Sequence, residues 1–260
     1  PMKNLFPSTV ESILLVCDVA FAVGCSGSSN KAEQTLQKLQ LPDGFSASIY
    51  ASTVPNARQL ALGDNGIVYA GSREKGNVYA IVDEDGDYHA DQIYTVAKDL
   101  RMPSGIAYRD GSLYVAAVSK ILRYDNIADN LQSPPDPVVI TDDYPTDGHH
   151  GWKFIAFGPE GKLYVPVGAP CNICNPDNDI YASITRINPD GSNREIVAHG
   201  VRNSVGFDWH PKTGDLWFTD NGRDWMGDNR PPCELNHLSE VEQHFGYPYK
   251  HGSNIWDPEF

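Results

Sequence analysis

A short pattern of apolar residues and glycine occurs four times in this chain and narrows its possible folds more than any other feature. In each copy an apolar run leads into a turn that contains glycine, and an apolar run with an aromatic residue follows; the copies span residues 60–69, 106–114, 155–164 and 207–217. Their aromatic residues, Tyr69, Tyr114, Tyr164 and Trp217, are 45, 50 and 53 residues apart. This spacing accommodates one four-stranded sheet per repeat, and such sheets bury their faces only against neighbours around a ring. We therefore predict an all-β fold, a β-propeller.

The propeller is expected over residues 42–260. Four copies are too few for most closed propellers, and the last residues, 256–260, do not resemble a closing strand, so we expect a C-terminally truncated propeller of about four to five blades. The body shows no sustained helical periodicity apart from a short helical piece expected around residues 238–245.

The N-terminal residues predict export. Apolar runs at 13–17 and 19–23 end in Gly24-Cys25 and are followed by Ser-Gly-Ser-Ser, an order that resembles a bacterial lipoprotein leader. A cleaved secretory signal without lipid and a frayed N-terminal helix are the alternatives. We expect a leader at 1–25, a polar tether at 26–41, and a periplasmic or outer-membrane-anchored bacterial protein.

Composition excludes some partners. The net charge of −14 disfavours a nucleic-acid backbone or an anionic membrane surface, because both require clustered Lys and Arg.

The pair Cys171 and Cys174 could form a local disulfide, a redox pair or half of a zinc site; no second CxxC exists, and an exported protein favours the disulfide. Cys233 would then be unpaired.

The residues just before each repeat are the candidate site. In a propeller these segments converge near the central axis, and here they are Arg58-Gln59, Pro103-Ser104, His149-His150 and Arg202-Asn203. Arginine binds carboxylates with two parallel hydrogen bonds, and histidine titrates near neutral pH. The alternative is that polar residues simply occupy loops. The paired arginine and histidine instead favour a shallow cavity that binds an anionic, carbonyl-rich ligand and moves a proton.

Several segments resemble a known family. Residues 149–168, beginning His-His-Gly-Trp-Lys, and residues 200–207, Gly-Val-Arg-Asn-Ser-Val-Gly-Phe, are similar to the active-site segments of soluble pyrroloquinoline quinone (PQQ)-dependent sugar dehydrogenases. So are residues 220–223 and 234–236, and the run 168–172 resembles the L-sorbosone and aldose sugar dehydrogenase group. The resemblance implies a six-bladed propeller with PQQ and Ca²⁺ as cofactors.

The resemblance also implies roles for single residues. His149 matches the general base that takes a proton from the sugar, with His150 the less favoured candidate. Arg202 matches the residue that stabilises negative charge on the quinone oxygen. The cofactor contacts are Gln59, His149, Arg202 and Asn203, and the backbone carbonyls of Gly222 and Arg223 match a calcium site. The implied reaction oxidises an aldose or aldehyde-bearing sugar to a lactone or acid, with an external quinone or cytochrome as electron acceptor.

The chain departs from the family pattern in three places. Ala169 stands where an acidic residue often orients the histidine, and Arg223 stands where proline is common. Further basic cofactor ligands of the family belong to later blades, beyond Phe260, so we expect the 260-residue chain by itself to bind PQQ weakly or not at all.

Two other functions stay open. Asn203, Asp220 and Asn221 could belong to a metal-dependent propeller lactonase similar to gluconolactonases, and a propeller can also be a non-catalytic binding module. The acidic run 83–91 resembles a calcium loop, but its glycine comes one place early and position twelve is Tyr94. For this run we predict an Asp-Gly hairpin turn.

Overall fold

The computed structural model describes residues 29–260 and divides the chain into two units, residues 1–52 and 53–260. The first unit contains helix α1 (Ser29–Leu36), which lies within the predicted tether. The predicted leader falls outside the described residues and stays a prediction. Among the described residues, no helix has both the length and the apolar composition needed to cross a bilayer.

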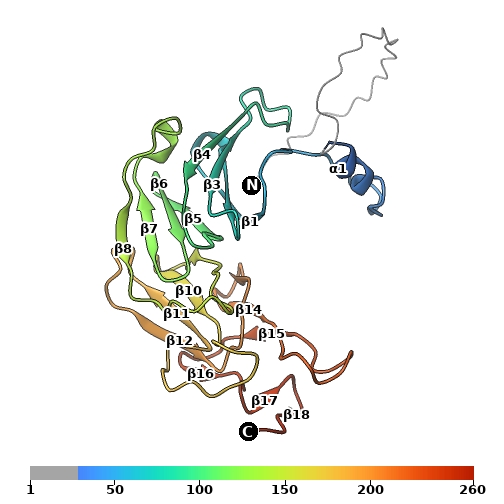
Figure 1. Ribbon diagram of the computed structural model, residues 1–260, viewed down its shortest axis with the longest axis vertical. Helices are drawn as coiled ribbons and strands as arrows, with labels where there is room; N and C mark the ends of the chain where they lie inside the picture. The colour runs from blue at the N-terminus through green and yellow to red at the C-terminus, as the bar shows by residue number, and fades with distance from the viewer. Residues whose placement is uncertain (1–28) are drawn as a thin grey trace. The chain divides into compact units, whose positions relative to one another are not determined.

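The second unit is built of sheets that follow one another along the chain (Figure 1), and their strands pair antiparallel except for β12 with β16. The first sheet has the order β1-β2-β3-β4 and the second β5-β6-β7-β8; the third is β9 to β12 with β16 added beside β12, and the fourth is β13-β14-β15. A small hairpin, β17-β18, comes last. The strands span Ala57–Leu62, Val68–Ser72, Val78–Val82, Gln92–Ala97, Gly105–Arg109, Ser112–Ala116, Ile121–Tyr124, Val138–Thr141, Ala156–Phe157, Leu163–Val167, Ser183–Ile187, Glu195–His199, Phe207–Trp209, Leu216–Asp220, Glu234–His237, Gln243–His244, Lys250–His251 and Ile255–Trp256. This is a four-blade β-propeller arrangement, and the predicted fold class is confirmed.

The repeated aromatic residues join each sheet to the next. All four lie on the second strand of their sheets, and the first three pack against an aromatic ring on the first strand of the following sheet. The pairs are Tyr69 with Tyr108 at 5.5 Å between ring centroids, Tyr114 with Phe157 at 4.9 Å, and Tyr164 with Trp209 at 5.0 Å. The period found in the sequence is therefore the period of an inter-sheet contact.

The glycine of the repeat is required by the same tyrosine. A side chain at Gly63 would place its Cβ 2.5 Å from the Tyr69 ring, and one at Gly158 would lie 2.7 Å from the Tyr164 ring. Real Cβ atoms do not approach so closely, so only glycine lets the turn fold back over the ring.

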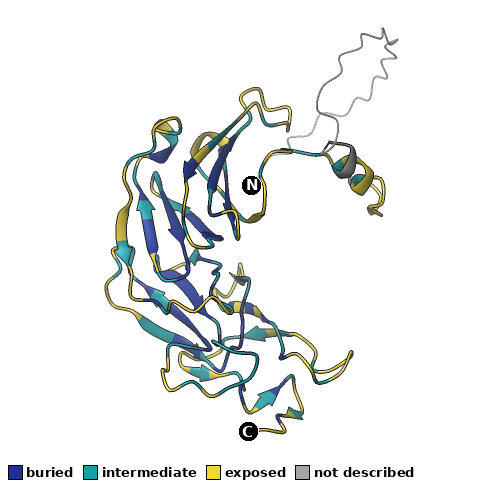
Figure 2. Ribbon diagram, viewed as in Figure 1, coloured by how far each residue is buried: buried dark blue, intermediate teal, exposed yellow. Residues whose placement is uncertain are grey.

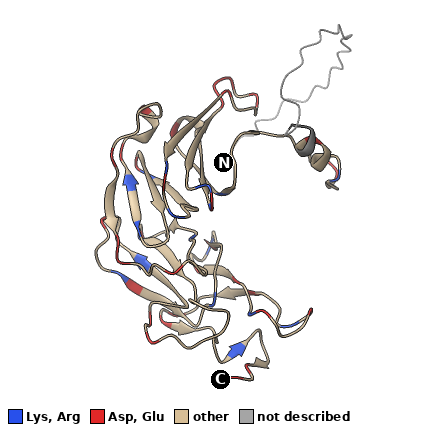
Figure 3. Cartoon of the chain, in the orientation of Figure 1, with Lys and Arg blue, Asp and Glu red and all other residues tan. Residues whose placement is uncertain are grey.

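The core lies between sheets rather than around a single centre. Every residue of β10 in the third sheet is buried, because neighbouring sheets cover both of its faces (Figure 2). On β14 burial alternates, with Leu216, Phe218 and Asp220 buried and Trp217 and Thr219 exposed. Lys and Arg are interspersed with Asp and Glu along the described chain (Figure 3).

The prediction of a helix around residues 238–245 is wrong. Within this segment Gln243–His244 forms strand β16, which pairs in parallel with β12. The amide of Glu242 donates to the carbonyl of Val197 at 2.8 Å, and the amide of Phe245 donates to that of His199 at 2.8 Å. Hydrogen bonds to a neighbouring strand therefore override the local helical pattern.

Candidate active site

His150 is held in a fixed orientation at the entrance to the third sheet. Its backbone adopts a φ of 50°, in the left-handed region, and its Nδ1 lies 2.9 Å from the carbonyl oxygen of Ala169. Gly168 makes this approach possible, because a Cβ there would lie 2.5 Å from the Cβ of His150. A carbonyl can only accept, so Nδ1 carries the proton and Nε2 presents a lone pair.

His150 is also kept neutral by its surroundings. Burial lowers its pKa to about 4, and the charges of Arg202 and His149 act in the same direction. A neutral imidazole with a free Nε2 is the form that accepts a proton. His149, the residue that the sequence favoured as the base, is exposed, and its ring centroid lies 4.0 Å from that of His150.

Arg202 lies next to this histidine and is only 3% exposed. Its Nε donates to the carbonyl of Asn172 at 2.8 Å, its Nη2 to the Asn172 side-chain oxygen at 2.8 Å, and its Nη1 to the carbonyl of Asn221 at 3.0 Å. The amide of Ala169 donates to the carbonyl of Arg202 at 2.8 Å. Ala169 therefore links the candidate base and the candidate arginine through its own backbone.

Asp220 fixes the backbone on which Arg202 and Asn203 lie. Its two carboxylate oxygens accept the amide protons of Arg202 and Asn203, at 2.9 and 2.7 Å. Burial raises the pKa of Asp220 to about 7, while these two hydrogen bonds oppose the shift. Because both oxygens bind backbone amides, Asp220 serves here as a positioning residue.

A disulfide constrains the loop that contains Asn172. Cys171 and Cys174 are bonded, as predicted, and Cys233 is free and exposed in the described chain. The hydroxyl of Tyr247 accepts the amide proton of Cys174 at 3.0 Å and lies 3.3 Å from the sulfur of Cys171. The loop that binds Arg202 is thus tied to itself and to a more distant segment.

The predicted calcium carbonyls lie beside this arginine. Asn221 donates its amide proton to the carbonyl of Asn203 at 3.2 Å, which sets Gly222 and Arg223 directly after it. Among residues 29–260, neither the carbonyl of Gly222 nor that of Arg223 accepts a hydrogen bond. The Arg223 side chain instead binds Asp257 at 2.6 Å and Glu259 at 3.0 Å. Carbonyl oxygens without a hydrogen-bond partner are donors of the kind that Ca²⁺ prefers, and the calcium site at Gly222 and Arg223 stays a prediction.

Gln59 joins three sheets. Its side-chain oxygen accepts the amide protons of Ile106 at 3.0 Å and Ile155 at 3.1 Å, and its amide nitrogen donates to the carbonyl of Ile155 at 2.7 Å. These bonds tie β1 to the starts of the second and third sheets. They also occupy the polar atoms expected to contact a cofactor.

The segments before the repeats converge only in part as predicted. A cavity of about 380 Å³ is lined by Arg58, Gln59 and Ser104 from the first two of these segments. The third and fourth contribute Trp152, Lys153 and Val205, together with apolar neighbours. The histidines and Arg202-Asn203 are absent from this lining. They form a separate cluster around Ala169.

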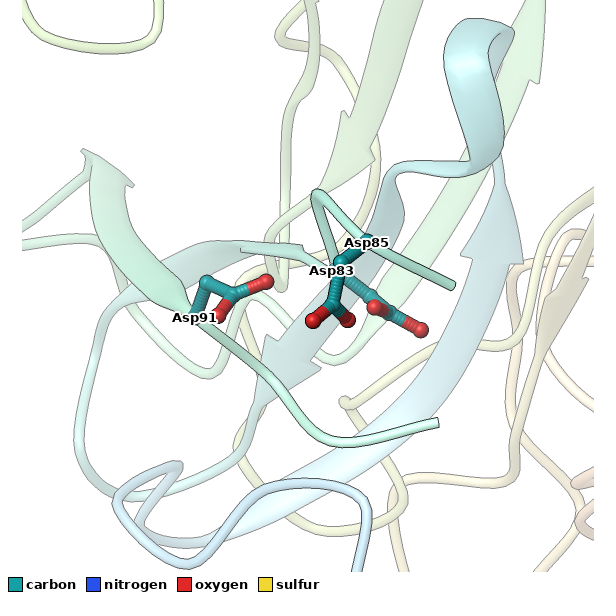
Figure 4. A group of neighbouring side chains, drawn as sticks. All are labelled: Asp83, Asp85 and Asp91. Carbon is teal, nitrogen blue, oxygen red and sulfur yellow. The ribbon is translucent and has the colours of Figure 1, made fainter. Parts of the chain in front are cut away.

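The acidic run at residues 83–91 connects β3 to β4, as predicted for a hairpin. Carboxylate oxygens of Asp83, Asp85 and Asp91 lie within 4.8 Å of one another (Figure 4). Each carboxylate already accepts a backbone amide proton of the same loop; Asp83, for example, binds the amides of Gly86 and Tyr88 at 2.8 and 3.0 Å. Hydrogen bonds within the turn therefore explain this cluster.

Comparison with models of known protein families identifies the family of this chain. The TrAA12-like family model matches residues 39–259. The chain belongs to the TrAA12-like family. This assignment confirms the expected relation to PQQ-dependent sugar oxidoreductases.

The chain is also similar to single proteins. An uncharacterized protein of Borreliella burgdorferi is 32% identical over 97% of this chain and 66% of its own length. The PQQ-bound aldose sugar dehydrogenase of Streptomyces coelicolor is similar in fold, with a TM-score of 0.62 and 21% identity over 81% of this chain and 69% of that one. The calcium structure of the Trichoderma reesei family AA12 enzyme has a TM-score of 0.63 and 17% identity over 74% of this chain and 56% of that one. The TrAA12-like chain therefore spans about two thirds of the length of the curated relative.

Sequence reasoning missed three contributors to the TrAA12-like site. Asn172 receives two hydrogen bonds from Arg202, and only its place in the motif 168–172 pointed to it. Trp152 lines the cavity and is flanked by the guanidinium groups of Arg58 and Arg73. Nothing in the local pattern marked Arg73, because it approaches the Trp152 ring from the loop after β2.

Proposed function

We propose that this chain carries the proton-accepting and charge-stabilising part of a PQQ- and calcium-dependent dehydrogenase. Its substrate would be an aldose or aldehyde-bearing sugar, and its product the lactone or acid. The observation that carries the proposal is the geometry of His150, whose Nδ1 is bound to the Ala169 carbonyl while Arg202 lies next to the ring. Bound PQQ, polarised by the metal, would supply the two-electron oxidising capacity.

The base would be His150. In the oxidation of a sugar hemiacetal, the C1–H bond breaks with its electron pair, the hydroxyl proton leaves, and a C=O bond forms. Nε2 of His150 accepts that proton, because Nδ1 is already protonated and bound. The backbone carbonyl of Ala169 does the orienting for which the family often uses an acidic side chain. His149, which the sequence favoured, is the competing candidate and is included in the test below.

Arg202 would stabilise the negative charge that grows on an oxygen of the acceptor. Burial lowers its pKa, but an arginine in this setting remains protonated. Its hydrogen bonds to Asn172 and Asn221 fix the guanidinium plane before any ligand binds. Preorganisation of this kind makes electrostatic stabilisation effective, because no reorientation is needed during the reaction. The carbonyls of Gly222 and Arg223 would hold the calcium ion.

The lactonase alternative has less support. A metal-activated water requires several free ligands, and the only cluster of three or more His, Cys, Asp or Glu side chains in residues 29–260 is Asp83, Asp85 and Asp91. Asp220 is occupied by two backbone amides.

The experiment is a cofactor titration of the full-length protein. We expect aldose-dependent reduction of an artificial electron acceptor only when PQQ and Ca²⁺ are both added, and its loss on addition of a chelator. Arg194→Gln is the matched control, because Arg194 pairs with Asp143 outside the site and should keep its activity. Lactone hydrolysis without PQQ, or no sugar-dependent reduction at all, would contradict the proposal.

A further inference from the structure

The cavity near the inner strands contains cations without matching anions. Its lining includes Arg58 and Lys153 but no Asp or Glu, in a chain whose net charge is −14. In residues 29–260, neither Arg58 nor Arg73 takes part in an ion pair, whereas Arg109, Arg186 and Arg194 all do. Unpaired like charges close together are unfavourable, and an anionic ligand would relieve their repulsion.

Trp152 holds the two arginines in place. The guanidinium carbon of Arg58 lies 4.4 Å from the centroid of the Trp152 ring, and that of Arg73 lies 5.7 Å from it. A guanidinium group over an aromatic face keeps its N–H groups directed outward from its own edge, where they can bind a carboxylate with two bonds. The Nε of Arg73 is buried and has no hydrogen-bond partner among residues 29–260. The aromatic ring thus orients donors that this part of the chain does not use.

The neutral polar residues of the cavity are already occupied. Gln59 binds the backbone of Ile106 and Ile155, and the hydroxyl of Ser104 donates to the carbonyl of Lys153 at 3.0 Å. Lys153 is only 2% exposed, and its Nζ lies 5.3 Å from the ring of Tyr144, which does not line the cavity. Arg58 is therefore the polar side chain of the lining left to select a ligand, and it selects for negative charge rather than for the hydroxyl pattern of a neutral sugar.

We propose that this cavity binds the carboxylate of an acidic sugar, so that the substrate class is a uronate rather than a neutral hexose. The inference rests on the proposed function, because Trp152 lies two residues after His150 and places the cavity on the segment that carries the base. A uronate keeps its anomeric hydroxyl and can lose two electrons and two protons at C1. The volume of about 380 Å³ is sufficient for a monosaccharide.

The test compares galacturonate with galactose, which differ only at C6. Calorimetry on the full-length protein without PQQ should show galacturonate binding at least about tenfold tighter than galactose, as one charge-assisted contact would provide. The preference should weaken with added salt. The substitutions R58Q and R73Q should each remove most of this preference for galacturonate. R58K, which keeps the charge, should retain part of it.

The control is R194Q, because Arg194 also lies over an aromatic ring, 5.2 Å from that of Tyr144, but is neutralised by Asp143. This variant should keep the full preference. Equal affinity for the two sugars would overturn the proposal. So would a loss of PQQ binding in R58Q and R73Q with the galacturonate preference unchanged, since the cations would then serve the cofactor. A failure of the proposed dehydrogenase activity would look different: acceptor reduction would be absent while the binding preference persisted.

Discussion

His150 shows how a backbone group can replace a missing side chain. The sequence indicated that Ala169 stands where the family often has an acidic residue, and it favoured His149 as the base. In the structure the carbonyl of Ala169 reaches Nδ1 of His150 instead. No sequence pattern reveals such a bond, because every residue except proline has the same backbone groups. The assignment of the base to His150 is a prediction of this account.

The low pKa of His150 predicts where activity fails in acid. A base with a pKa of about 4 stays unprotonated through mildly acidic conditions. The acidic limb of kcat/KM for the PQQ- and Ca²⁺-loaded protein should therefore fall between roughly pH 4 and 5, below the ordinary value of about 6.5 for a solvated imidazole. A limb near 6.5 would argue against His150.

Stability should depend on pH through the same group. The unfolded chain binds a proton at His150 near pH 6.5, but the folded chain does so only near 4. Stability is therefore lost as the pH falls from about 6.5 to 4. Denaturant unfolding of H150Q should show a shallower loss over this window than the wild type, and H149Q should not. Identical slopes in the two variants would contradict the burial of His150.

The buried Lys153 is expected to lower the stability of the folded chain. This side chain is 2% exposed, and burial lowers its pKa to about 8. The substitution K153M removes a buried charge at similar volume and should raise the free energy of unfolding at pH 7 by roughly 1 to 3 kcal/mol. Wild-type stability should also rise with pH above about 8, as the folded protein releases this proton first. Urea titrations at pH 7 and 9 measure both effects, and an unchanged or lower stability of K153M would contradict them.

The repeated sheet was the most predictable part of the chain. Its period and its aromatic residues were visible in the sequence, and three of the four aromatics make the same contact with the next sheet. The segment 238–245 was not predictable in this way, because the partner strand of β16 lies more than forty residues earlier. Helix α1 in the expected tether was missed because a short polar helix carries little periodic signal in its own sequence.

The turn glycines give a test at the level of this repeat. In G158A, the new Cβ would lie 2.5 Å from a Glu160 carboxylate oxygen and 2.7 Å from the Tyr164 ring. The free energy of unfolding should fall by about 1 to 3 kcal/mol, as is typical of overpacking. G206A is the control, because its Cβ would meet only the Thr219 hydroxyl at 4.0 Å and should change stability by less than about 0.5 kcal/mol. Equal effects in urea unfolding would show that the turn does not depend on this close approach.

The first and fourth sheets each leave apolar residues exposed. Leu60 and Leu62 of β1 are 59% and 71% exposed, and Trp217 and Leu235 of the fourth sheet are 38% and 68% exposed. Exposed apolar faces of this kind favour association. The 260-residue chain should therefore bind a hydrophobic dye and self-associate. The double substitution of Leu60 and Leu62 by threonine should reduce both, whereas the same change at Val138 and Val139 on β8 should not.

The architecture and the family could thus be predicted from the sequence, because both rest on repeated or contiguous sequence patterns. The division of the polar residues into a cavity and a separate cluster around Ala169 was not, since it depends on which backbone groups meet between sheets. The order of the segments along the chain predicts which of them approach the propeller axis, but it does not predict how deeply each side chain is buried.

The proposed mechanism depends most on His150 being the general base. The measurement is the rate of acceptor reduction by the PQQ- and Ca²⁺-loaded full-length protein, with H150Q and H149Q compared under saturating sugar. We expect H150Q to lose at least about a hundredfold in kcat, because a general base is removed, and H149Q to stay within about tenfold of the wild type. A large loss in H149Q together with near-normal turnover in H150Q would contradict the proposed mechanism.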